Sequence, residues 1–488
     1  KKMLKKVLIF HFFILVLRVL YVLFRDIDLS PEEAQYWLWS KFLDLSYYSK
    51  PPLIAYLNFL STSILGDTEI GVRINAIILG FFIAIITYVF SKELFKDEKV
   101  AFFNSVFIYA VPAYDIASVI FLTDTPLAFF YLLLSYLFYK SVKENKPFLW
   151  IMTGISAGLA FLSKYSAVFF FPVAIVYLTI FSKETFKNRW FYLSILIAGI
   201  FTIPVIYWNF NNDFVSFKHV EKLSGAEGSF SINLKHFGDY ILGQVGINSL
   251  FLTPFFVYSL YKAFKDKDER FIYLSLSPIV VFTFFGFMAL KKNVEANWPA
   301  FGYSTLYILT GYYIYTRFLK VALIPMGLSI LSILILFYTP ILDSLGLTKI
   351  LPPKIDPTKR LVGWSEMASF VSDLKKHYPK SFVFSDSYHI SSEMSFYMEG
   401  KPFVYCVRID RRMNQWDLWE GLEKYENKGY YGIYVADHQI NEKVKSGFES
   451  VEKYYTYRVK YRGEFVKDYY IYVLKNYKKL NEDPITTY

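Results

Sequence analysis

Long apolar runs constrain this chain more than any other feature of its sequence. They lie before about residue 342, and the rest of the 488 residues has the composition of a soluble domain. A helix needs about 20 apolar residues to cross the hydrocarbon layer of a membrane. The sequence therefore predicts an α-helical polytopic membrane protein that ends in a small soluble α/β domain.

About eleven apolar runs are candidates for membrane-spanning helices. They lie near residues 7–24, 70–91, 100–118, 122–140, 147–162, 164–181, 190–208, 238–261, 270–290, 298–316 and 320–340. The run at 52–65 is short, and we expect it to lie in the membrane interface or to re-enter the membrane. Lysines precede the first run, but it contains no small-residue cleavage site. We therefore expect an uncleaved first helix rather than a signal peptide.

Basic residues orient these helices. If the N-terminus is cytoplasmic, every predicted inner end is basic, as the positive-inside rule requires. The inner ends carry Lys1, Lys2, Lys5, Lys6, Lys92, Lys96, Lys99, Lys140, Lys143, Lys146, Lys183, Lys187, Arg189, Lys262, Lys265, Lys267, Arg270, Arg317 and Lys320. We therefore expect a multi-pass protein of the plasma (inner) membrane, with a cytoplasmic N-terminus and an extracytoplasmic, or periplasmic, C-terminal domain.

The sequence predicts two domains. Residues 1–342 form the transmembrane domain, with a long first outer loop at 25–69, and residues 343–488 form the soluble domain. In the soluble domain we expect a helix, three short strands and a hairpin around Arg462-Gly463. The helix is predicted at 363–378, the strands at 381–386, 401–406 and 431–436, and the hairpin strands at 454–461 and 465–474.

Charge and cysteine content exclude several classes of site. The net charge of +11 is explained first by the basic inner ends, so membrane lipids are expected as partners and nucleic acid is not. Cys406 is the single cysteine, which excludes an intramolecular disulfide, and no Cys/His group has zinc spacing. The acids and histidines are too scattered to indicate a metal. We expect no required cofactor, although a divalent metal is left open.

The first outer loop holds two adjacent carboxylates, Glu32 and Glu33, directly after Ser30-Pro31. One interpretation is structural: Ser30 caps a helix, Pro31 is its first residue, and the acids favour the positive end of the helix dipole. The other interpretation is catalytic, because aromatic residues follow and the loop ends in Lys50-Pro51-Pro52. Long outer loops between helices are common places for chemistry.

This loop resembles the first extracytoplasmic loop of polyprenyl-phosphate-sugar glycosyltransferases of the GT-C fold. That group includes the protein O-mannosyltransferases, the lipid A aminoarabinose transferases and the bacterial lipopolysaccharide galacturonosyltransferases. The matching segments are Glu32-Glu33-Ala-Gln-Tyr36 and Tyr47-Tyr48-Ser49-Lys50-Pro51-Pro52. The first acid of the pair is usually Asp in these families, and the aminoarabinose enzymes carry an acid where this chain has Ser49.

The resemblance continues through most of the chain in order. The further matching segments are Gly66–Arg73, Leu122-Thr-Asp-Thr-Pro126, Leu162-Ser-Lys-Tyr165, Ala296-Asn-Trp-Pro-Ala300 and Arg412–Trp419. It implies displacement at the anomeric carbon of a sugar, with a lipid monophosphate as the leaving group. One direct displacement inverts the anomeric configuration.

This reaction requires a base for the acceptor hydroxyl and cations for the leaving phosphate. The acceptor hydroxyl must lose a proton, and Glu32 is the expected base, with Glu33 as the substitute. The departing phosphate gains charge, and Lys50 is expected to bind it. Lys164 lies at a predicted outer membrane edge, where an ionisable group is a functional candidate or snorkels to the headgroups. The remaining candidate cations for the phosphate are Lys291, Lys292 and Arg73, of which the two lysines are alternatively interface anchors.

Three further residues are predicted near the substrate. Asp124 is at a tight outer turn, where it either caps the next helix or positions the first loop. Tyr36 and Tyr47 are expected to stack on the sugar or to bond to phosphate. With 42 tyrosines in the chain, most tyrosines belong to the interface belt or the core, so the resemblance of the loop is what selects these two.

The expected substrates are a polyprenyl-phosphate sugar and an extracytoplasmic acceptor. Lipid A or another envelope glycolipid is the first expectation for the acceptor, and Ser or Thr of a secreted protein is the alternative. Two other classes are a transporter and a ligand-binding sensor. Charges are nearly absent from the middle of the predicted spans and no two halves look alike, which disfavours a transporter. A sensor needs only one span and no acids in its first loop.

Overall fold

The computed structural model describes residues 1–229 and 231–488. These residues form two compact units, which we call the helical unit and the sheet unit. The helical unit contains Lys1–Phe24, Lys50–Leu57 and Arg73–Leu334. The sheet unit contains Arg25–Ser49, Asn58–Val72 and Ile335–Tyr488. The first-loop segments 25–49 and 58–72 therefore group with the C-terminal residues, whereas the sequence places 25–69 as a loop of the first domain.

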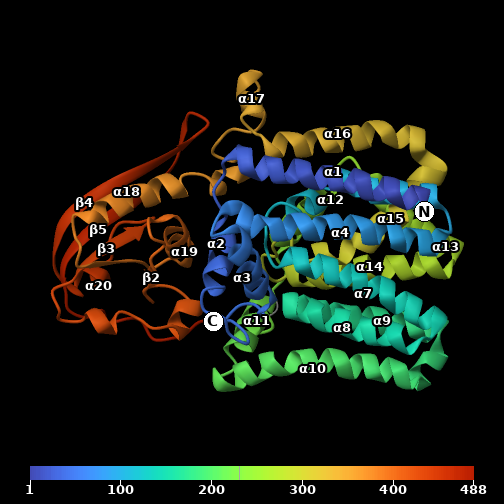
Figure 1. The fold of residues 1–488 in the computed structure, drawn as a ribbon, viewed down its shortest axis with the longest axis horizontal. Helices are drawn as coiled ribbons and strands as arrows, with labels where there is room; N and C mark the ends of the chain where they lie inside the picture. Colours follow the sequence, from blue (N-terminus) through green and yellow to red (C-terminus); the bar gives the residue numbers. More distant parts are fainter. Residues whose placement is uncertain (230) are drawn as a thin grey trace. The chain divides into compact units, whose positions relative to one another are not determined.

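The helical unit is built almost entirely of apolar helices. They are α1 (Lys2–Arg25), α4 (Glu69–Phe95), α5 (Glu98–Phe107), α6 (Pro112–Ala117), α7 (Asp124–Glu144), α8 (Pro147–Ser163), α9 (Phe170–Phe181), α10 (Arg189–Asn211), α11 (Val215–Ser224), α12 (Leu234–Asn248), α13 (Thr253–Asp266), α14 (Glu269–Ala289), α15 (Ser304–Tyr313) and α16 (Leu319–Phe337). In Figure 1, α4, α7, α8 and α10 run lengthwise, and α8 packs against both α7 and α10. Polar N-caps such as Asp97 and Asp268 satisfy the first free N–H groups of α5 and α14.

Among the described residues, six helices are long and apolar enough to cross a membrane, or seven if the bent pair α12–α13 is one span. Five predicted spans correspond to single long helices, and the last two fall in one helical stretch, Ala300–Phe337. The count by helix length is lower than about eleven because the remaining predicted spans are short or broken helices. The run at 100–118 is divided into α5 and α6, 147–162 and 164–181 are short, and α12–α13 bends by 96°.

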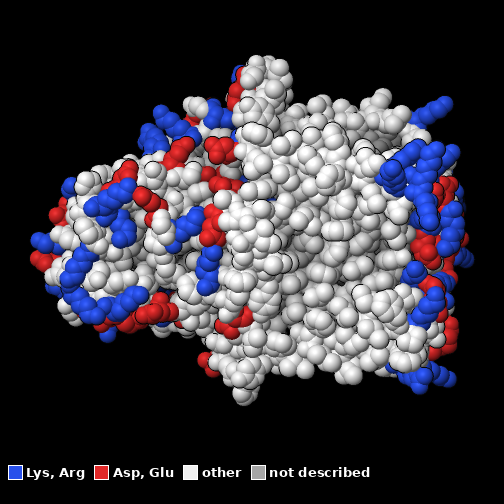
Figure 2. Space-filling view, in the orientation of Figure 1, with Lys and Arg blue, Asp and Glu red and all other residues white. Residues whose placement is uncertain are grey.

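Predicted inner ends of the helices meet one another in the helical unit. Lys143 at the end of α7 pairs with Glu269 at the start of α14 at 2.6 Å. Arg270 donates to the Leu94 carbonyl at the end of α4 at 2.9 Å. Figure 2 shows the surface of this unit as a broad uncharged band, with Lys and Arg gathered at one end of it. The basic ends of α4, α7 and α14 therefore lie together, as the charge pattern predicts.

One charged pair lies among the apolar helices. Arg18 of α1 binds Asp115 of α6 at 2.8 Å, and both side chains are about nine-tenths buried. The guanidinium also lies over the rings of Tyr109 and Tyr114. The sequence predicted almost no charged residues in the middle of the spans, and this pair is an exception. A buried charge needs such a partner because removing it from water alone costs several kcal/mol, roughly.

The sheet unit contains one mixed five-stranded sheet with the order β2-β1-β3-β5-β4. Its strands are β1 (Ser381–Ser385), β2 (Tyr405–Cys406), β3 (Tyr431–Ala436), β4 (Phe448–Tyr461) and β5 (Glu464–Tyr477). β2, β1 and β3 are parallel, and β5 pairs antiparallel with β3 and β4. The prediction of three strands and a hairpin is confirmed, although β2 is only two residues long.

Alternating side chains give the sheet two buried faces. Val383 of β1 packs in a cluster with α18 (Trp364–Lys376) and α19 (Tyr388–Tyr397). Its neighbours Phe382 and Phe384 point to the opposite face, where they pack with Tyr434 and Leu422. The predicted helix at 363–378 is α18, whereas the sequence analysis did not foresee α19.

The first-loop segments are built into the sheet unit by hydrogen bonds. Asp28 accepts from the backbone N–H groups of Trp364 and Ser365 at 2.9 and 3.1 Å, and so caps α18. The Leu29 N–H donates to the Tyr397 hydroxyl at 2.6 Å. The short helix α2 (Pro31–Trp39) packs against α19. These contacts join the first-loop segments and the C-terminal residues into one compact unit.

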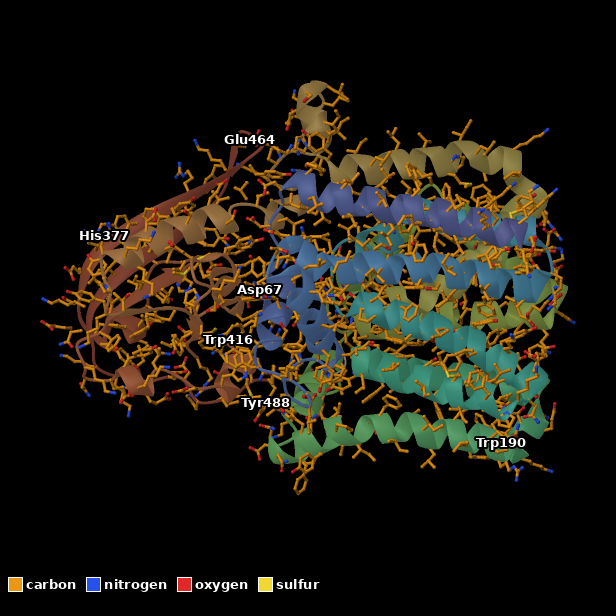
Figure 3. All side chains as sticks on the ribbon, viewed as in Figure 1. Asp67, Trp190, His377, Trp416, Glu464 and Tyr488 are labelled. Atoms are coloured by element: carbon orange, nitrogen blue, oxygen red, sulfur yellow. The ribbon has the colours of Figure 1, made fainter. Side chains whose placement is uncertain are left out.

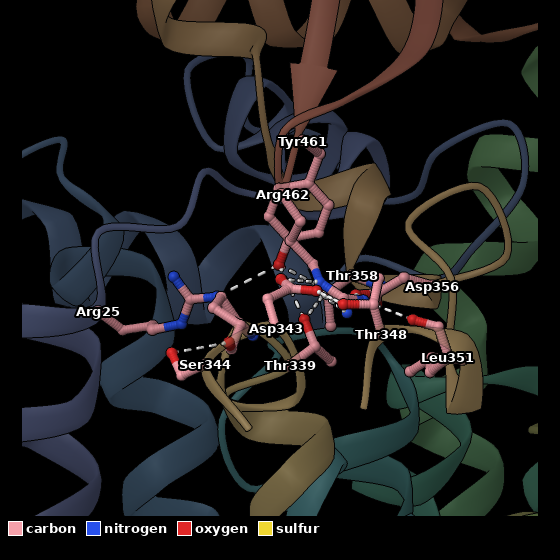
Figure 4. A network of polar contacts seen from close by, with 11 residues as sticks. Arg25, Thr339, Asp343, Ser344, Thr348, Leu351, Asp356, Thr358, Tyr461 and Arg462 are labelled. Carbon is pink, nitrogen blue, oxygen red and sulfur yellow. Dashed lines mark hydrogen bonds and ion pairs between the residues drawn. The ribbon is translucent and has the colours of Figure 1, made fainter. Parts of the chain in front are cut away.

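The hairpin turn anchors the start of the C-terminal segment (Figure 4). Arg462 and Gly463 both have positive φ, as the tight turn between β4 and β5 requires. The Arg462 guanidinium pairs with Asp343 at 2.7 Å and with Asp356 at 3.1 Å. The Arg462 and Asp356 side chains are almost completely buried.

We expect Arg462→Met to lower the Tm of the detergent-solubilised protein by about 5 °C or more, because buried Asp356 loses its cationic partner. The matched control is Arg458→Met on the same strand, where the pair with Asp468 is exposed. That variant should stay within about 1 °C of the wild type. Equal melting temperatures for the two variants would contradict the anchoring role of Arg462.

Candidate functional site

Three polar side chains meet at the ends of the helices that lie opposite to the basic ends of α4, α7 and α14. Lys164 Nζ lies 2.8 Å from Asp124 Oδ1, and Asn297 Nδ2 donates to Asp124 Oδ2 at 2.7 Å. The Lys164 and Asp124 side chains are only 11% and 15% exposed. Asp124 begins α7 and Lys164 follows the end of α8, so both stand at the predicted outer ends. The structure thus brings Asp124 and Lys164 together.

Local sequence explains this meeting point. Lys164 has an extended backbone, which interrupts the apolar run between α8 and the next helical turn. Asn297 belongs to a loop after α14, and that loop is held by the Gln244 side chain, which donates to the Ala296 carbonyl at 3.1 Å. Gly243 lies against the same residue, since a Cβ there would approach the Ala296 Cβ to 3.0 Å. Asn297 lies in the segment Ala296-Asn-Trp-Pro-Ala300, which belongs to the resemblance, but no role was predicted for this residue.

The other predicted cations differ in their burial and in their contacts. Lys292 donates to the Lys222 carbonyl at the end of α11 at 2.7 Å, an interaction typical of a helix C-terminus. Lys291 is exposed and Lys50 is half-buried. Arg73, in the first turns of α4, is completely buried. Each of these four residues has interaction partners in the structure.

Glu33 and Glu32 have different environments although they are adjacent. The Glu33 carboxylate accepts from the Ser30 N–H at 3.0 Å, and the Ser30 hydroxyl accepts from the Glu33 N–H at 3.3 Å, which completes a capping box. Glu33 is completely buried. The structural interpretation of Ser30-Pro31 is therefore confirmed. Glu32 is the half-buried acid of the pair, with a side chain 27% exposed.

Residues of the C-terminal segment surround Glu32. Arg360 lies 2.8 Å from Glu32 Oε1, and His389 Nε2 lies 3.9 Å from the same atom. Burial lowers the pKa of His389, the Glu32 carboxylate opposes this effect, and Arg360 adds to it. The sequence analysis missed Arg360 and His389, because they are more than 300 residues from Glu32 and no local pattern connects them.

The two predicted substrate tyrosines are packed inside the sheet unit. The Tyr47 hydroxyl donates to backbone carbonyls of the same loop, including that of Trp39 at 3.0 Å, and its ring stacks on Trp39 at 4.6 Å. Tyr36 is also buried and packs edge-on against Trp39. These contacts hold Tyr47 within the loop, and the substrate contact expected of Tyr36 and Tyr47 stays a prediction. Asp67, labelled in Figure 3, accepts from the Trp37 ring N–H at 2.8 Å and so binds the other end of α2.

The carboxyl ends of the parallel strands carry a second group of polar residues. Asp386 directly follows β1 and accepts from the Tyr434 hydroxyl at 2.8 Å, and it lies 2.8 Å from His438 Nε2. His438 follows β3. In residues 1–229 and 231–488, no three His, Cys, Asp or Glu side chains gather as a metal site.

The chain is similar to known glycosyltransferases. Residues 49–208 match a family described as dolichyl-phosphate-mannose-protein mannosyltransferase. The lipid A galacturonosyltransferase RgtD of Rhizobium johnstonii is 25% identical over 308 residues, which are 62% of this chain and 64% of that protein. The undecaprenyl phosphate-alpha-4-amino-4-deoxy-L-arabinose arabinosyl transferase 2 of Proteus mirabilis is 23% identical over 302 residues, or 55% and 53%. The matched region therefore spans between half and two thirds of these curated relatives.

Solved structures with the same fold cover nearly the whole chain. ArnT from Cupriavidus metallidurans, in the apo state and bound to undecaprenyl phosphate, aligns with TM-scores of 0.64 and 0.65. The alignments cover 94% and 95% of this chain and 97% of each solved chain, at 14% and 12% sequence identity. The chain therefore has the ArnT fold, a polytopic membrane protein with a C-terminal mixed-sheet domain.

The His438–Asp386 pair predicts a pH-dependent stability. Partial burial alone lowers the pKa of His438, but hydrogen bonds to the Gln439 carbonyl and to Asp386 outweigh it and raise the pKa above 6.5. The protonated ring therefore stabilises the fold fully below pH 6.5, and this contribution disappears as pH rises through the raised pKa. We expect His438→Gln to lower the Tm more at about pH 5.5 than at about pH 9.

The matched control for this measurement is His377→Gln, because His377 is an exposed histidine at the end of α18. Its effect on the Tm should be small, because the side chain is exposed. A His438→Gln effect that grows toward alkaline pH would show that the pKa of His438 is not raised in the folded protein.

Proposed function

Because the chain is homologous to polyprenyl-phosphate-sugar glycosyltransferases of the ArnT and RgtD type, we propose that it transfers a sugar from a polyprenyl-phosphate carrier to an extracytoplasmic acceptor. The observation that carries the proposal is the shared fold over 94% of the chain, together with the sequence match to a family of lipid-phosphate-sugar transferases. The matched family and the two named relatives are all described as transferases, which favours this class over the transporter and sensor alternatives.

We propose Glu32 as the general base. An acceptor hydroxyl attacks the anomeric carbon, its proton passes to the carboxylate, and the bond from that carbon to the phosphate oxygen breaks. The configuration inverts because the displacement is direct. Glu32 suits this role because it is partly exposed, whereas Glu33 is buried in the cap of α2. Arg360 holds one Glu32 oxygen and so fixes the direction of the carboxylate.

We propose that cations of the helical unit bind the donor phosphate, with Lys164 as the principal one. Lys164 is kept in place by Asp124, which Asn297 fixes from the other side. A lysine at an outer helix end meets a lipid phosphate at the depth of the headgroups. Lys50 follows the Tyr47-Tyr48-Ser49 segment directly and is proposed as the second cation. Lys291, Lys292 and Arg73 are proposed to add positive charge.

Lipid A or another envelope glycolipid is the proposed acceptor, because the relative with 25% identity is a lipid A galacturonosyltransferase. The hydroxyl of a protein Ser or Thr is the second candidate acceptor. Residues 49–208 match a family described as dolichyl-phosphate-mannose-protein mannosyltransferase. We also propose the orientation given by the positive-inside pattern, with the sheet unit outside the cytoplasm. The reaction is proposed to need no metal, because a carboxylate base and lysine cations supply both required roles.

We expect Glu32→Gln to lower transfer by about 10²–10⁴-fold, since the amide still accepts from Arg360 but takes no proton. The measurement is release of free polyprenyl phosphate from a lipid-linked sugar by purified protein, with cell lipids as acceptors. Glu464→Gln, an exposed acid at the hairpin tip in Figure 3, is the matched control and should be fully active. Full turnover in Glu32→Gln would exclude the base assignment, and loss of turnover in EDTA would exclude the metal-free reaction.

We expect Lys164→Met to lower kcat/KM for the donor by about 10²-fold, because the leaving phosphate loses a preorganised cation. Lys164→Arg, which keeps the charge, should recover part of the rate. Lys235→Met, an exposed lysine near the start of α12, is the control and should change little. If Lys164→Met turns over the donor normally at wild-type Tm, Lys164 is only an anchor at the membrane surface.

A further inference from the structure

A cavity opens beside the carboxyl ends of the parallel strands. In α/β sheets, ligands bind in the crevice outside these ends, because loops and helix starts converge there. The cavity has a volume of about 480 Å³, a size that suits a monosaccharide phosphate. It is lined by Asp410, Arg411, Arg412, Asp483, Pro484, Thr486 and Thr487. The segment 483–487 forms one wall, held by the Asp483 N–H on the Arg408 carbonyl and the Met413 N–H on the Thr487 carbonyl.

Most of the charges in this cavity are already neutralised. Asp410 and Asp483 share Lys443, at 3.1 and 2.9 Å. Arg411 binds both carboxylate oxygens of Asp417, at 2.8 and 2.9 Å, and also three backbone carbonyls. Arg408 also binds Asp417, at 3.1 Å. The three acids of these pairs are therefore balanced by three basic side chains, and these pairs leave no net charge for a ligand.

Arg412 is different from these neighbours. Its side chain is exposed, and no hydrogen bond or ion pair joins its guanidinium to another residue in the part of the chain that the structure describes. Thr486 and Thr487, whose hydroxyl groups can donate hydrogen bonds, line the same cavity. A free guanidinium with neighbouring hydroxyls matches the several acceptor oxygens of a phosphate monoester.

Arg412 and the proposed base both act on the same side chain, Tyr388. Burial raises the pKa of Tyr388, the Glu32 carboxylate raises it further, and the Arg412 guanidinium acts in the opposite direction. Both charges therefore lie within electrostatic reach of the same hydroxyl. Tyr388 is the residue before His389, whose ring lies 3.9 Å from Glu32.

From this arrangement we propose that the cavity at Arg412 binds a phosphate monoester of the acceptor and so presents a hydroxyl of the acceptor to Glu32. This inference rests on the proposed function for the identity of the ligand as acceptor. The binding itself is independent of turnover. Arg412 is a specificity-determining residue in this scheme, and Thr486 and Thr487 complete the oxyanion site.

The test is hydrogen exchange by mass spectrometry on the full-length protein in detergent, with glucosamine 1-phosphate as the probe. The readout is protection of peptides covering 408–413 and 481–487, which separates this cavity from any phosphate site in the helical unit. We expect protection in the wild type and at least about a tenfold rise in Kd for Arg412→Gln, because a charge-assisted bond is lost. Arg458→Gln, an exposed arginine of the same unit, should bind as the wild type does.

Two further probes test whether the site recognises a phosphate group. Uncharged N-acetylglucosamine should give no protection, and glucuronate should bind more weakly than the sugar phosphate. Equal protection in Arg412→Gln overturns the site, and glucuronate binding as tight as phosphate overturns the assignment to a phosphate. Protection that depends on Arg412 in a protein that releases no polyprenyl phosphate would uphold the site and reject the transferase.

Discussion

The Asp28 carboxylate at the start of α18 is the interaction on which the arrangement of the candidate site depends. It joins the first loop to the C-terminal segment through two backbone N–H groups. Burial raises the pKa of Asp28, and the hydrogen bonds from Ser365 and Trp364 act against that effect. With this cap in place, α2 packs on α19, and Glu32 comes within reach of Arg360 and His389.

Much of the fold follows from the sequence because its signals are local. Apolar runs of about 20 residues predict helices, and basic residues at alternate ends predict which ends meet, as Lys143 and Glu269 confirm. Alternating side chains around Arg462-Gly463 predict the hairpin of β4 and β5. The helix start at Ser30-Pro31 is also local, and its capping box forms as predicted.

The rest of the site depends on residues far apart in the chain, for which one sequence has no signal. Arg18 and Asp115 lie in separate runs, and only the packing of α1 reveals the pair. Asn297 reaches Asp124 across 173 residues. Tyr47 could be recognised as part of a motif but not as a residue whose hydroxyl closes its own loop. The assignments of Glu32 and Lys164 as base and phosphate ligand stay predictions.

Asp28 and Trp364 are 336 residues apart in the chain, so their contact forms only late in synthesis. At a synthesis rate of roughly 5–20 residues per second, the first loop waits about 20–70 s before its partner helices exist. During that interval the apolar side chains of α2, such as Trp37 and Leu38, have no C-terminal segment to cover them. Biogenesis of this protein therefore includes a period in which a newly made apolar loop needs protection by the insertion machinery or by chaperones.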